Sequence, residues 1–128
     1  MSPRVLVVDD EPFIVAGLRV FLEDEGMHVG SAGSGEEAVD IVRNDSSFNV
    51  CIIDMRLPGM NGDSTIRALH QICPDLRFII HTGSADYSIP DDLRAIGINE
   101  SLFFAKPLMD MTPLAETVAA LTSDRNRV

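Results

Sequence analysis

The chain has 128 residues and a formal net charge of −10, because 20 acidic side chains outnumber 10 basic ones. This length fits one domain with a single core, and so few scattered basic residues argue against direct binding of nucleic acid. No apolar run approaches the ~20 residues of a membrane helix and the N-terminus lacks a signal-peptide pattern, so we expect a cytoplasmic protein that binds no membrane.

The first half of the chain alternates between apolar, β-branched runs and helical patterns. It predicts a strand at Arg4–Val8, a helix at Pro12–Glu25, a strand at His28–Ala32, a helix beginning after Ser34 and a strand at Val50–Ile53. The first helix is indicated by Ile14, Leu18 and Leu22, which recur on one helical face. The second is indicated by Ser34 and Glu37, whose spacing of three residues is that of a capping box.

The second half repeats this alternation. It predicts a turn-rich loop at Leu57–Gly62, a helix with the face Ile66, Leu69 and Ile72, a strand at Arg77–His81, a helix at Ser88–Ile96, a strand at Leu102–Ala105 and a helix at Asp110–Leu121. Pro90 near the start of the fourth helix predicts that this helix is short or distorted. Residues 1–122 then form the domain, and 123–128 are a polar tail or the start of a linker.

Five strands alternating with five helices indicate an α/β fold with a parallel sheet covered on both faces. The strands are almost continuously apolar, as expected of strands that are buried on both sides. Cys51 and Cys73 lie in apolar runs without metal-ligand spacing, so we expect buried, reduced thiols. Open sheets of this kind bind ligands beyond the carboxyl ends of their strands, which is where site residues are expected.

Chemically active residues follow four of the predicted strands. Asp9 and Asp10 follow the first, Asp54 the third, Thr82 lies at the end of the fourth, and Lys106 follows the fifth. Three carboxylates without a Cys or His partner favour a hard cation such as Mg²⁺, which keeps waters that a phosphate oxygen can replace. A metal, an ammonium and a hydroxyl around one carboxylate suit phosphoryl transfer, with Asp54 as the nucleophile that forms an acyl phosphate.

Taken one at a time, these residues have simpler interpretations. Asp9 and Asp10 can end a strand in solvent or cap a helix, and a single lysine such as Lys106 most often lies on the surface. Their joint occurrence at the strand ends favours a functional cleft. His81, next to Thr82, is expected to be structural, because a lone histidine that ends a strand rarely belongs to a site.

Four segments resemble the receiver domains of two-component response regulators. They are Val7-Val8-Asp9-Asp10-Glu11-Pro12, Asp54-Met55-Arg56-Leu57-Pro58-Gly59-Met60-Asn61-Gly62, Thr82-Gly83 and Lys106-Pro107. They occur in the family's order and span essentially the whole chain. The resemblance, which extends to the chemotaxis response regulators, implies a flavodoxin-like, doubly wound (βα)5 fold with the strand order 2-1-3-4-5.

The resemblance also implies roles for the residues at the strand ends. Asp54 would be the phosphoacceptor, and Lys106 would pair with a phosphoryl oxygen. Mg²⁺, with Mn²⁺ as a substitute, would be held by Asp10, Asp54 and the backbone carbonyl of Arg56, and by Asp9 through water.

The resemblance implies further roles for backbone groups and for the two residues that change position on phosphorylation. The N–H groups of Met55 and Gly83 would donate to the phosphoryl group. Thr82 and Phe103 would change position when that group is present, and the Lys106–Pro107 peptide would be cis. Phe103 lacks the hydroxyl of the tyrosine that is common at this position, so the switch would depend on packing alone.

In this family a sensor histidine kinase or a phosphotransfer protein donates the phosphoryl group, and the altered surface then changes partner affinity. The chain would promote its own phosphorylation and dephosphorylation without being a conventional enzyme. A homodimer would form through the fourth helix, fifth strand and fifth helix, and the short fourth helix predicts that this output face is atypical. The sequence does not predict which effector domain or partner protein responds to this change.

Three other functions stay open at this point. An aspartyl-nucleophile phosphatase typically has Asp-x-Asp after the first strand, where this chain has Asp9, Asp10 and Glu11. These three acids would also repel the phosphate of a flavin, which argues against a flavodoxin relative. A phosphorylation-independent interaction module would not need the complete set of site residues.

Overall fold

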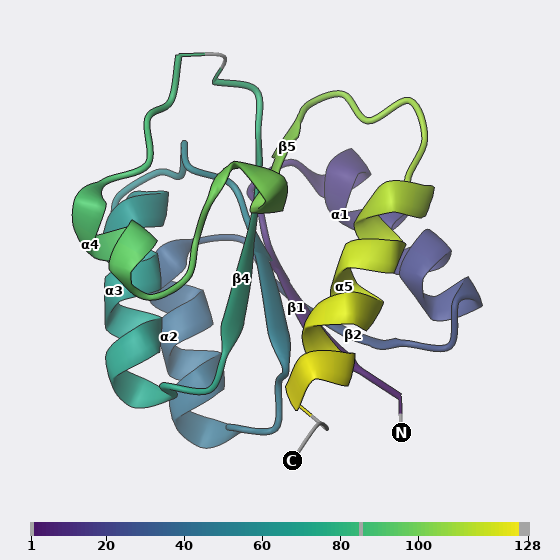
Figure 1. Cartoon of the computed structure of the whole chain (residues 1–128), viewed down its shortest axis with the longest axis horizontal. Helices are drawn as coiled ribbons and strands as arrows, with labels where there is room; N and C mark the ends of the chain where they lie inside the picture. Colours follow the sequence, from purple (N-terminus) through teal and green to yellow (C-terminus); the bar gives the residue numbers. More distant parts are fainter. Residues whose placement is uncertain (1, 85, 126–128) are drawn as a thin grey trace.

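The structure, a computed structural model, describes residues 2–84 and 86–125, without the side chains of residues 124 and 125 (Figure 1). Its elements are β1 Arg4–Val8, α1 Pro12–Asp24, β2 His28–Ala32, α2 Gly35–Asn44, β3 Val50–Ile53, α3 Gly62–Ile72, β4 Arg77–Thr82, α4 Asp91–Ala95, a 3₁₀ turn at Glu100–Leu102, β5 Phe103–Ala105 and α5 Thr112–Arg125. The five strands form one parallel sheet in the order β2-β1-β3-β4-β5. The predicted fold class and strand order are confirmed.

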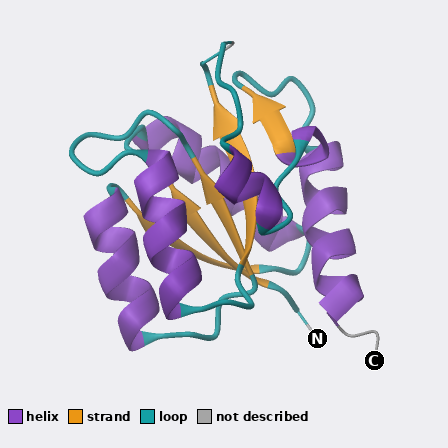
Figure 2. Cartoon of the chain, turned by 60° about the vertical axis from the view of Figure 1, so that its left-hand side comes forward, coloured by secondary structure: helices purple, strands orange, loops and turns teal. Residues whose placement is uncertain are grey.

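Helices cover both faces of the sheet, as Figures 1 and 2 show. Successive strand residues point to opposite faces, so Leu6 and Val8 pack with α2, α3 and α4, whereas Val5 and Val7 pack with α1 and α5. All four of these side chains are fully buried. The central strands are therefore apolar throughout, and the polar residues that follow them lie at the edge of the core.

The start of α3 is fixed close to the end of β3. Asn61 caps the helix by accepting a hydrogen bond from Ser64 N at 2.9 Å. Gly62 N donates to the carbonyl of Met55 at 3.0 Å, and a Cβ at Gly62 would lie 2.6 Å from the Asp54 carbonyl oxygen. Only glycine fits this close approach, which anchors the loop after Asp54 to the helix.

One of the two hydrogen bonds of the predicted capping box forms at the start of α2, and the other has a shifted donor. Ser34 Oγ accepts from Glu37 N at 3.1 Å, and the Glu37 carboxylate accepts from Gly33 N at 2.5 Å, one residue before the cap itself. α2 and α3 pack side by side on one face of the sheet (Figure 1).

Several element boundaries differ from the prediction, and those of α1, which ends at Asp24, and β4, which ends at Thr82, differ by one residue. α4 begins at Asp91 instead of Ser88, because the chain is still extended at Pro90, so the helix has only five residues and its predicted shortness is confirmed. β5 begins at Phe103, since Leu102 ends the 3₁₀ turn that Asn99 caps.

The last helix also has different ends. α5 begins at Thr112, whose N–H donates to the Asp110 carboxylate, and it continues past Leu121 to Arg125. Of the predicted polar tail 123–128, residues 126–128 lie outside the described part of the chain. No helix among the described residues is long and apolar enough to cross a membrane.

Candidate functional site

The carboxyl ends of β1, β3, β4 and β5 surround one open pocket, as the strand-end rule predicts. The hydrogen-bond ladder of the sheet extends into this region: Asp9 N donates to Ala32 O, Asp54 N to Val8 O, and Lys106 N to Thr82 O, each within 3.0 Å. The pocket is lined by Asp10, Glu11, Ile14, Asp54, Arg56, Thr82, Gly83, Lys106 and Pro107. The sheet therefore brings together residues that are far apart in the sequence.

Four carboxylates gather on the β1 and β3 side of this pocket. One oxygen each from Asp9, Asp10, Glu11 and Asp54 lies within 4.8 Å of the others. Asp9 and Asp54 are only 3% and 5% exposed, whereas Asp10 and Glu11 are open to solvent. Such a set of oxygen ligands, half buried and half solvated, fits a hexacoordinate Mg²⁺ ion that retains waters.

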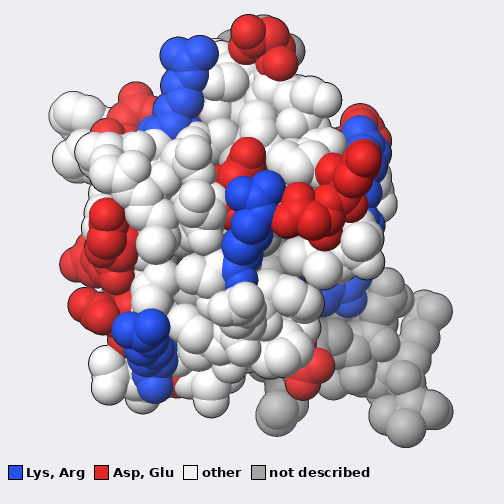
Figure 3. Space-filling model, turned by 90° about the vertical axis from the view of Figure 1, so that its left-hand side faces the viewer, with Lys and Arg blue, Asp and Glu red and all other residues white. Residues whose placement is uncertain are grey.

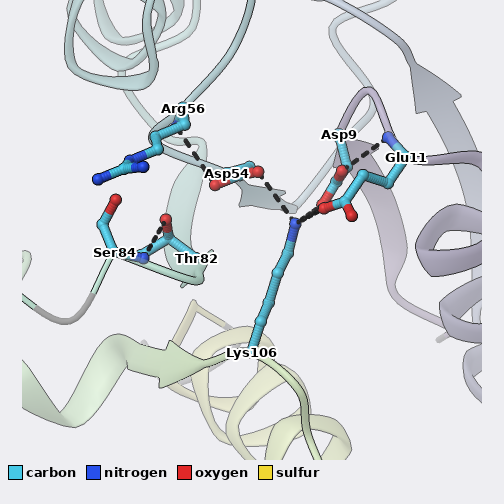
Figure 4. A network of polar contacts seen from close by, with 7 residues as sticks. All are labelled: Asp9, Glu11, Asp54, Arg56, Thr82, Ser84 and Lys106. Carbon is cyan, nitrogen blue, oxygen red and sulfur yellow. Dashed lines mark hydrogen bonds and ion pairs between the residues drawn. The ribbon is translucent and has the colours of Figure 1, made fainter.

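Lys106 is the single lysine of the sequence, and its ammonium lies inside this acidic cluster (Figure 4). Lys106 Nζ lies 2.7 Å from Asp9 Oδ2, 2.6 Å from Glu11 Oε2 and 3.0 Å from Asp54 Oδ2. Its three N–H donors thus face three carboxylates. Burial alone would lower the pKa of this ammonium, but the hydrogen bonds to the carboxylates raise it, so Lys106 is charged at any physiological pH.

The environment of Asp9 disfavours the charged form of its carboxyl, mainly because this side chain is buried. Burial raises the pKa of the Asp9 carboxyl above its usual range, and the charge of Asp54 raises it further. The bonds from Lys106 and from Glu11 N, which donates to Asp9 Oδ1 at 2.9 Å, lower this pKa but only in part. A further cation at this position would relieve the repulsion.

Asp54 is held by both of its oxygens. Its Oδ2 accepts from Lys106 Nζ, and its Oδ1 accepts from Arg56 N at 3.2 Å (Figure 4). The predicted backbone donors lie close by: Met55 is buried next to Asp54, and Gly83 lines the pocket with open space where a Cβ would stand. The carboxylate is therefore fixed in orientation within a partly open pocket.

The ends of β4 and β5 carry the predicted cis peptide and the two predicted switch residues. The Lys106–Pro107 peptide is cis, as the resemblance implied. Thr82 is 1% exposed, and its Oγ1 accepts a hydrogen bond from Ser84 N at 3.3 Å (Figure 4). Phe103 lies at the start of β5, paired with Ile80, and not in the pocket lining.

His81 is a buried residue beside the site, not a member of it. It is 3% exposed, and neither ring nitrogen has a hydrogen-bond partner among the described residues. Burial lowers the pKa of this imidazole to about 4, and the nearby Lys106 contributes to the shift. His81 is therefore neutral, in keeping with the structural role expected from the sequence.

Sequence reasoning missed two residues that the structure connects to the site. Glu11 contacts Lys106, and its position directly after Asp9 and Asp10 was the available signal. Tyr87 stacks on Phe103 with ring centroids 6.1 Å apart, and the motif pattern held no signal for this contact.

The face opposite α5 shows no basic patch among the described residues. In Figure 3 the Lys and Arg side chains stand singly, and acidic side chains lie beside them. This arrangement agrees with the composition, which argued against direct binding of nucleic acid.

Comparison with known proteins identifies the family. A family model described as the response regulator receiver domain matches residues 5–119. The response regulator GtcR of Aneurinibacillus migulanus is 29% identical over 121 residues, which cover 94% of this chain and 48% of that protein. The chain thus spans about half the length of this relative.

Solved structures give the same result. A response regulator receiver domain protein from Clostridium thermocellum superposes with a TM-score of 0.82 at 26% identity, with 97% of both chains covered. The response regulator protein TrrA from Thermotoga maritima, in complex with Mg²⁺-BeF, gives 0.77 at 28% identity over 93% of this chain and 98% of its own. The chain belongs to the response regulator receiver domain family.

Proposed function

We propose that this chain is a phosphoacceptor switch, in which a sensor histidine kinase or a phosphotransfer protein transfers a phosphoryl group to Asp54. The observation that carries the proposal is the geometry around Asp54: a nearly buried carboxylate, oriented by Arg56 N and Lys106 Nζ, beside an acidic cluster with excess negative charge. The complex of the related TrrA with Mg²⁺-BeF supports it, because fluoroberyllate resembles a phosphoryl group.

The residues of the cluster fit Mg²⁺, with Mn²⁺ as a substitute. Asp10, Asp54 and the Arg56 carbonyl would hold the ion directly, and Asp9 would hold it through water. When bound, the ion supplies positive charge beside the phosphoryl oxygens and the attacking carboxylate. The geometry supports this assignment, because four clustered carboxylates face the one ammonium of Lys106 and leave negative charge that a bound cation would balance.

Phosphoryl transfer then depends on this chain's own groups. An oxygen of Asp54 forms a bond to phosphorus while the bond from phosphorus to the donor histidine nitrogen breaks, and that nitrogen retains the electron pair. Lys106 moves from its carboxylate partners to a phosphoryl oxygen, and the N–H groups of Met55 and Gly83 donate to the others. Hydrolysis later releases inorganic phosphate and restores the Asp54 carboxylate.

The signal leaves through the surface near α4, β5 and α5. Thr82 would turn toward the phosphoryl group, and Phe103 would follow, so that the face changes its affinity for a second copy or for an effector. Residues 1–122 would form this signalling unit, and of the tail proposed at 123–128 the first three residues continue α5. The chain is thus a switch that modifies itself, not a turnover enzyme.

Incubation with Mg²⁺ and acetyl phosphate, followed by intact mass measurement, tests the proposal. We expect one phosphoryl adduct on the wild-type protein, and none on Asp54→Ala or when the metal is removed. Asp40→Asn, which changes an exposed carboxylate on α2, should be modified like the wild type. An unmodified wild-type protein would refute the proposal, and steady hydrolysis of small phosphomonoesters would favour an aspartyl-nucleophile phosphatase instead.

A further inference from the structure

Tyr87, the single tyrosine of the sequence, lies in the loop between β4 and α4 and connects three separate elements. Its hydroxyl donates to Asp63 Oδ1, in the first turn of α3, at 2.5 Å. Its ring stacks on Phe103 of β5, with 6.1 Å between the centroids and 15° between the planes. Such offset stacking is a favourable aromatic geometry.

Two routes lead from the pocket to this tyrosine. Along β4, the Thr82 hydroxyl oxygen accepts from Ser84 N, and the Ser84 carbonyl accepts from Tyr87 N at 3.4 Å. Ser84 is itself buried, so this hydrogen bond is shielded from water. A movement of the Thr82 hydroxyl therefore removes the acceptor that holds the start of the Tyr87 loop.

The second route begins at the acceptor carboxylate and runs through α3. Met55, which follows Asp54, accepts from Gly62 N at 3.0 Å, and Gly62 is followed directly by Asp63. Because a Cβ at Gly62 would clash with this loop, the helix start cannot slide independently of it. Asp63 is thus fixed relative to Asp54, and Tyr87 is fixed relative to Thr82.

Among the described residues, one other side-chain polar contact joins the α4 segment to α3. The helix has five residues, of which only Leu93 is buried. Arg67 pairs with Asp92 through two contacts of 2.6 Å and 3.1 Å, but both side chains are about half exposed, and such surface pairs contribute little. Ile89 and Leu93 are buried in the same core cluster as Ile66 and Leu69 of α3. The Tyr87–Asp63 bond therefore adds a directional polar restraint to this apolar packing.

We propose that Tyr87 is the positioning residue that couples the pocket to the α4–β5 face, by a hydroxyl contact with Asp63 that is made in one shape of the domain and lost in the other. When the Thr82 hydroxyl turns toward a phosphoryl group, Ser84 N loses its acceptor, the loop shifts, and Tyr87 leaves both Asp63 and the ring of Phe103. This inference rests on the proposed phosphoacceptor function. Tyr87 thus carries a hydroxyl next to Phe103, which has none of its own.

The tyrosine reports its own state, because the sequence has no tryptophan. A phenol that donates to a carboxylate emits weakly, since the excited state loses its proton to that acceptor. Adding Mg²⁺ and fluoroberyllate to the full chain should therefore increase tyrosine emission. Bound fluoroberyllate is measured in parallel by ¹⁹F NMR.

Matched variants separate coupling from a purely structural role. Asp63→Asn keeps the shape but weakens the acceptor, so its emission should be high from the start and change little on ligand addition. Tyr87→Phe removes only the hydroxyl, and we expect it to bind fluoroberyllate about three- to tenfold more tightly, because a contact specific to the other shape is lost. Asp40→Asn should match the wild type in both measurements.

The outcomes are distinguishable. If fluoroberyllate binds while tyrosine emission and the affinity of Tyr87→Phe stay unchanged, the coupling role of Tyr87 is wrong and the phosphoacceptor proposal stands. If no fluoroberyllate binds to the wild-type protein, both proposals fail. Weaker binding by a folded Tyr87→Phe would also overturn the coupling role, since it would mean that the hydroxyl supports the ligand-bound shape.

Discussion

Lys106 Nζ lies 3.0 Å from Asp54 Oδ2, although 52 residues separate the two in sequence. Each follows the end of its own parallel strand, and the same ammonium also contacts Asp9 and Glu11. The sheet topology therefore creates a site in which the ammonium of Lys106 contacts three carboxylates. The energetics and the chemistry of the domain both depend on these contacts.

Removal of the Lys106 ammonium should destabilise the protein. Lys106→Met leaves Asp9 and Asp54 buried beside each other without a counter-charge, and we expect the free energy of unfolding to fall by about 1.5–3 kcal/mol in metal-free buffer at pH 7. Urea titration measures the change. Lys106→Arg, which keeps the charge, should lose much less, and equal losses in both variants would contradict the electrostatic explanation.

Mg²⁺ should stabilise the domain through Asp10. At a hundredfold excess of free metal over its Kd, the free energy of unfolding should rise by about 2.7 kcal/mol. Asp10→Ala should lose most of this gain because it lacks a direct ligand, yet be more stable than the wild type in EDTA because one of the crowded carboxylates is gone.

Paired urea titrations with Mg²⁺ and with EDTA measure both effects of Asp10→Ala. Asp40→Ala, at an exposed position on α2, provides the control for a lost charge elsewhere. If Asp10→Ala gained as much stability from Mg²⁺ as the wild type, the ion would bind somewhere other than this cluster.

His81 should make stability depend on pH in the acid range. Its pKa is lowered to about 4 in the fold from 6.5 in the unfolded chain, so between these values the unfolded chain binds the proton that the fold excludes. The stabilising contribution is fully present above pH 6.5 and is lost as the pH falls toward 4, by up to about 3 kcal/mol.

Denaturant titrations from pH 7 to about pH 4 measure this contribution as a slope of the free energy of unfolding against pH. The slope arises because His81 binds a proton in the unfolded chain but not in the folded protein over this range. His81→Leu should flatten the slope, whereas His28→Leu, at an exposed position on β2, should retain it. A slope that persists unchanged in His81→Leu would assign the acid sensitivity to other groups.

Gly62→Ala should disturb the site through the backbone alone. The added methyl group would lie 2.6 Å from the Asp54 carbonyl oxygen and from Met55 Cα, so either α3 or the loop after Asp54 must shift. We expect a loss of about 1–3 kcal/mol in the free energy of unfolding, together with slower phosphorylation by acetyl phosphate.

Gly17→Ala is the matched control for that substitution. Gly17 lies inside α1, where the nearest atom to an added Cβ is Met111 Cε at an ordinary 3.7 Å. This variant should be slightly more stable than the wild type, because alanine favours the helix. A neutral effect of Gly62→Ala would show that the loop after Asp54 is not held as tightly as the contacts indicate.

The sequence predicted the sheet and the pocket because both follow from local patterns. Strands buried on both faces are continuous apolar runs, so β1 and β3 were predicted to the residue. The edge strand β2, which is only partly buried, had a weaker pattern but was also predicted with the correct bounds. Polar residues directly after those runs must lie at one edge of a parallel sheet. Asp9, Asp54 and Lys106 could thus be brought together without coordinates.

The remaining features depend on contacts that no local pattern encodes. The start of α4 is set by the extended conformation at Pro90, and the contact of Tyr87 with Asp63 requires the path of a loop that has no periodicity. Glu11 was visible in the acidic run, but its contact with Lys106 depends on where the first turn of α1 begins.

Chemical trapping of the acyl phosphate tests the central claim most directly. Borohydride reduces an aspartyl phosphate to homoserine, so wild-type protein treated with Mg²⁺ and acetyl phosphate, reduced and digested should yield a peptide with homoserine at position 54. The same treatment of Asp54→Asn, or of wild-type protein in EDTA, should yield none. Homoserine at another aspartate, or no homoserine in a folded wild-type protein, would contradict the assignment of Asp54 as the phosphoacceptor.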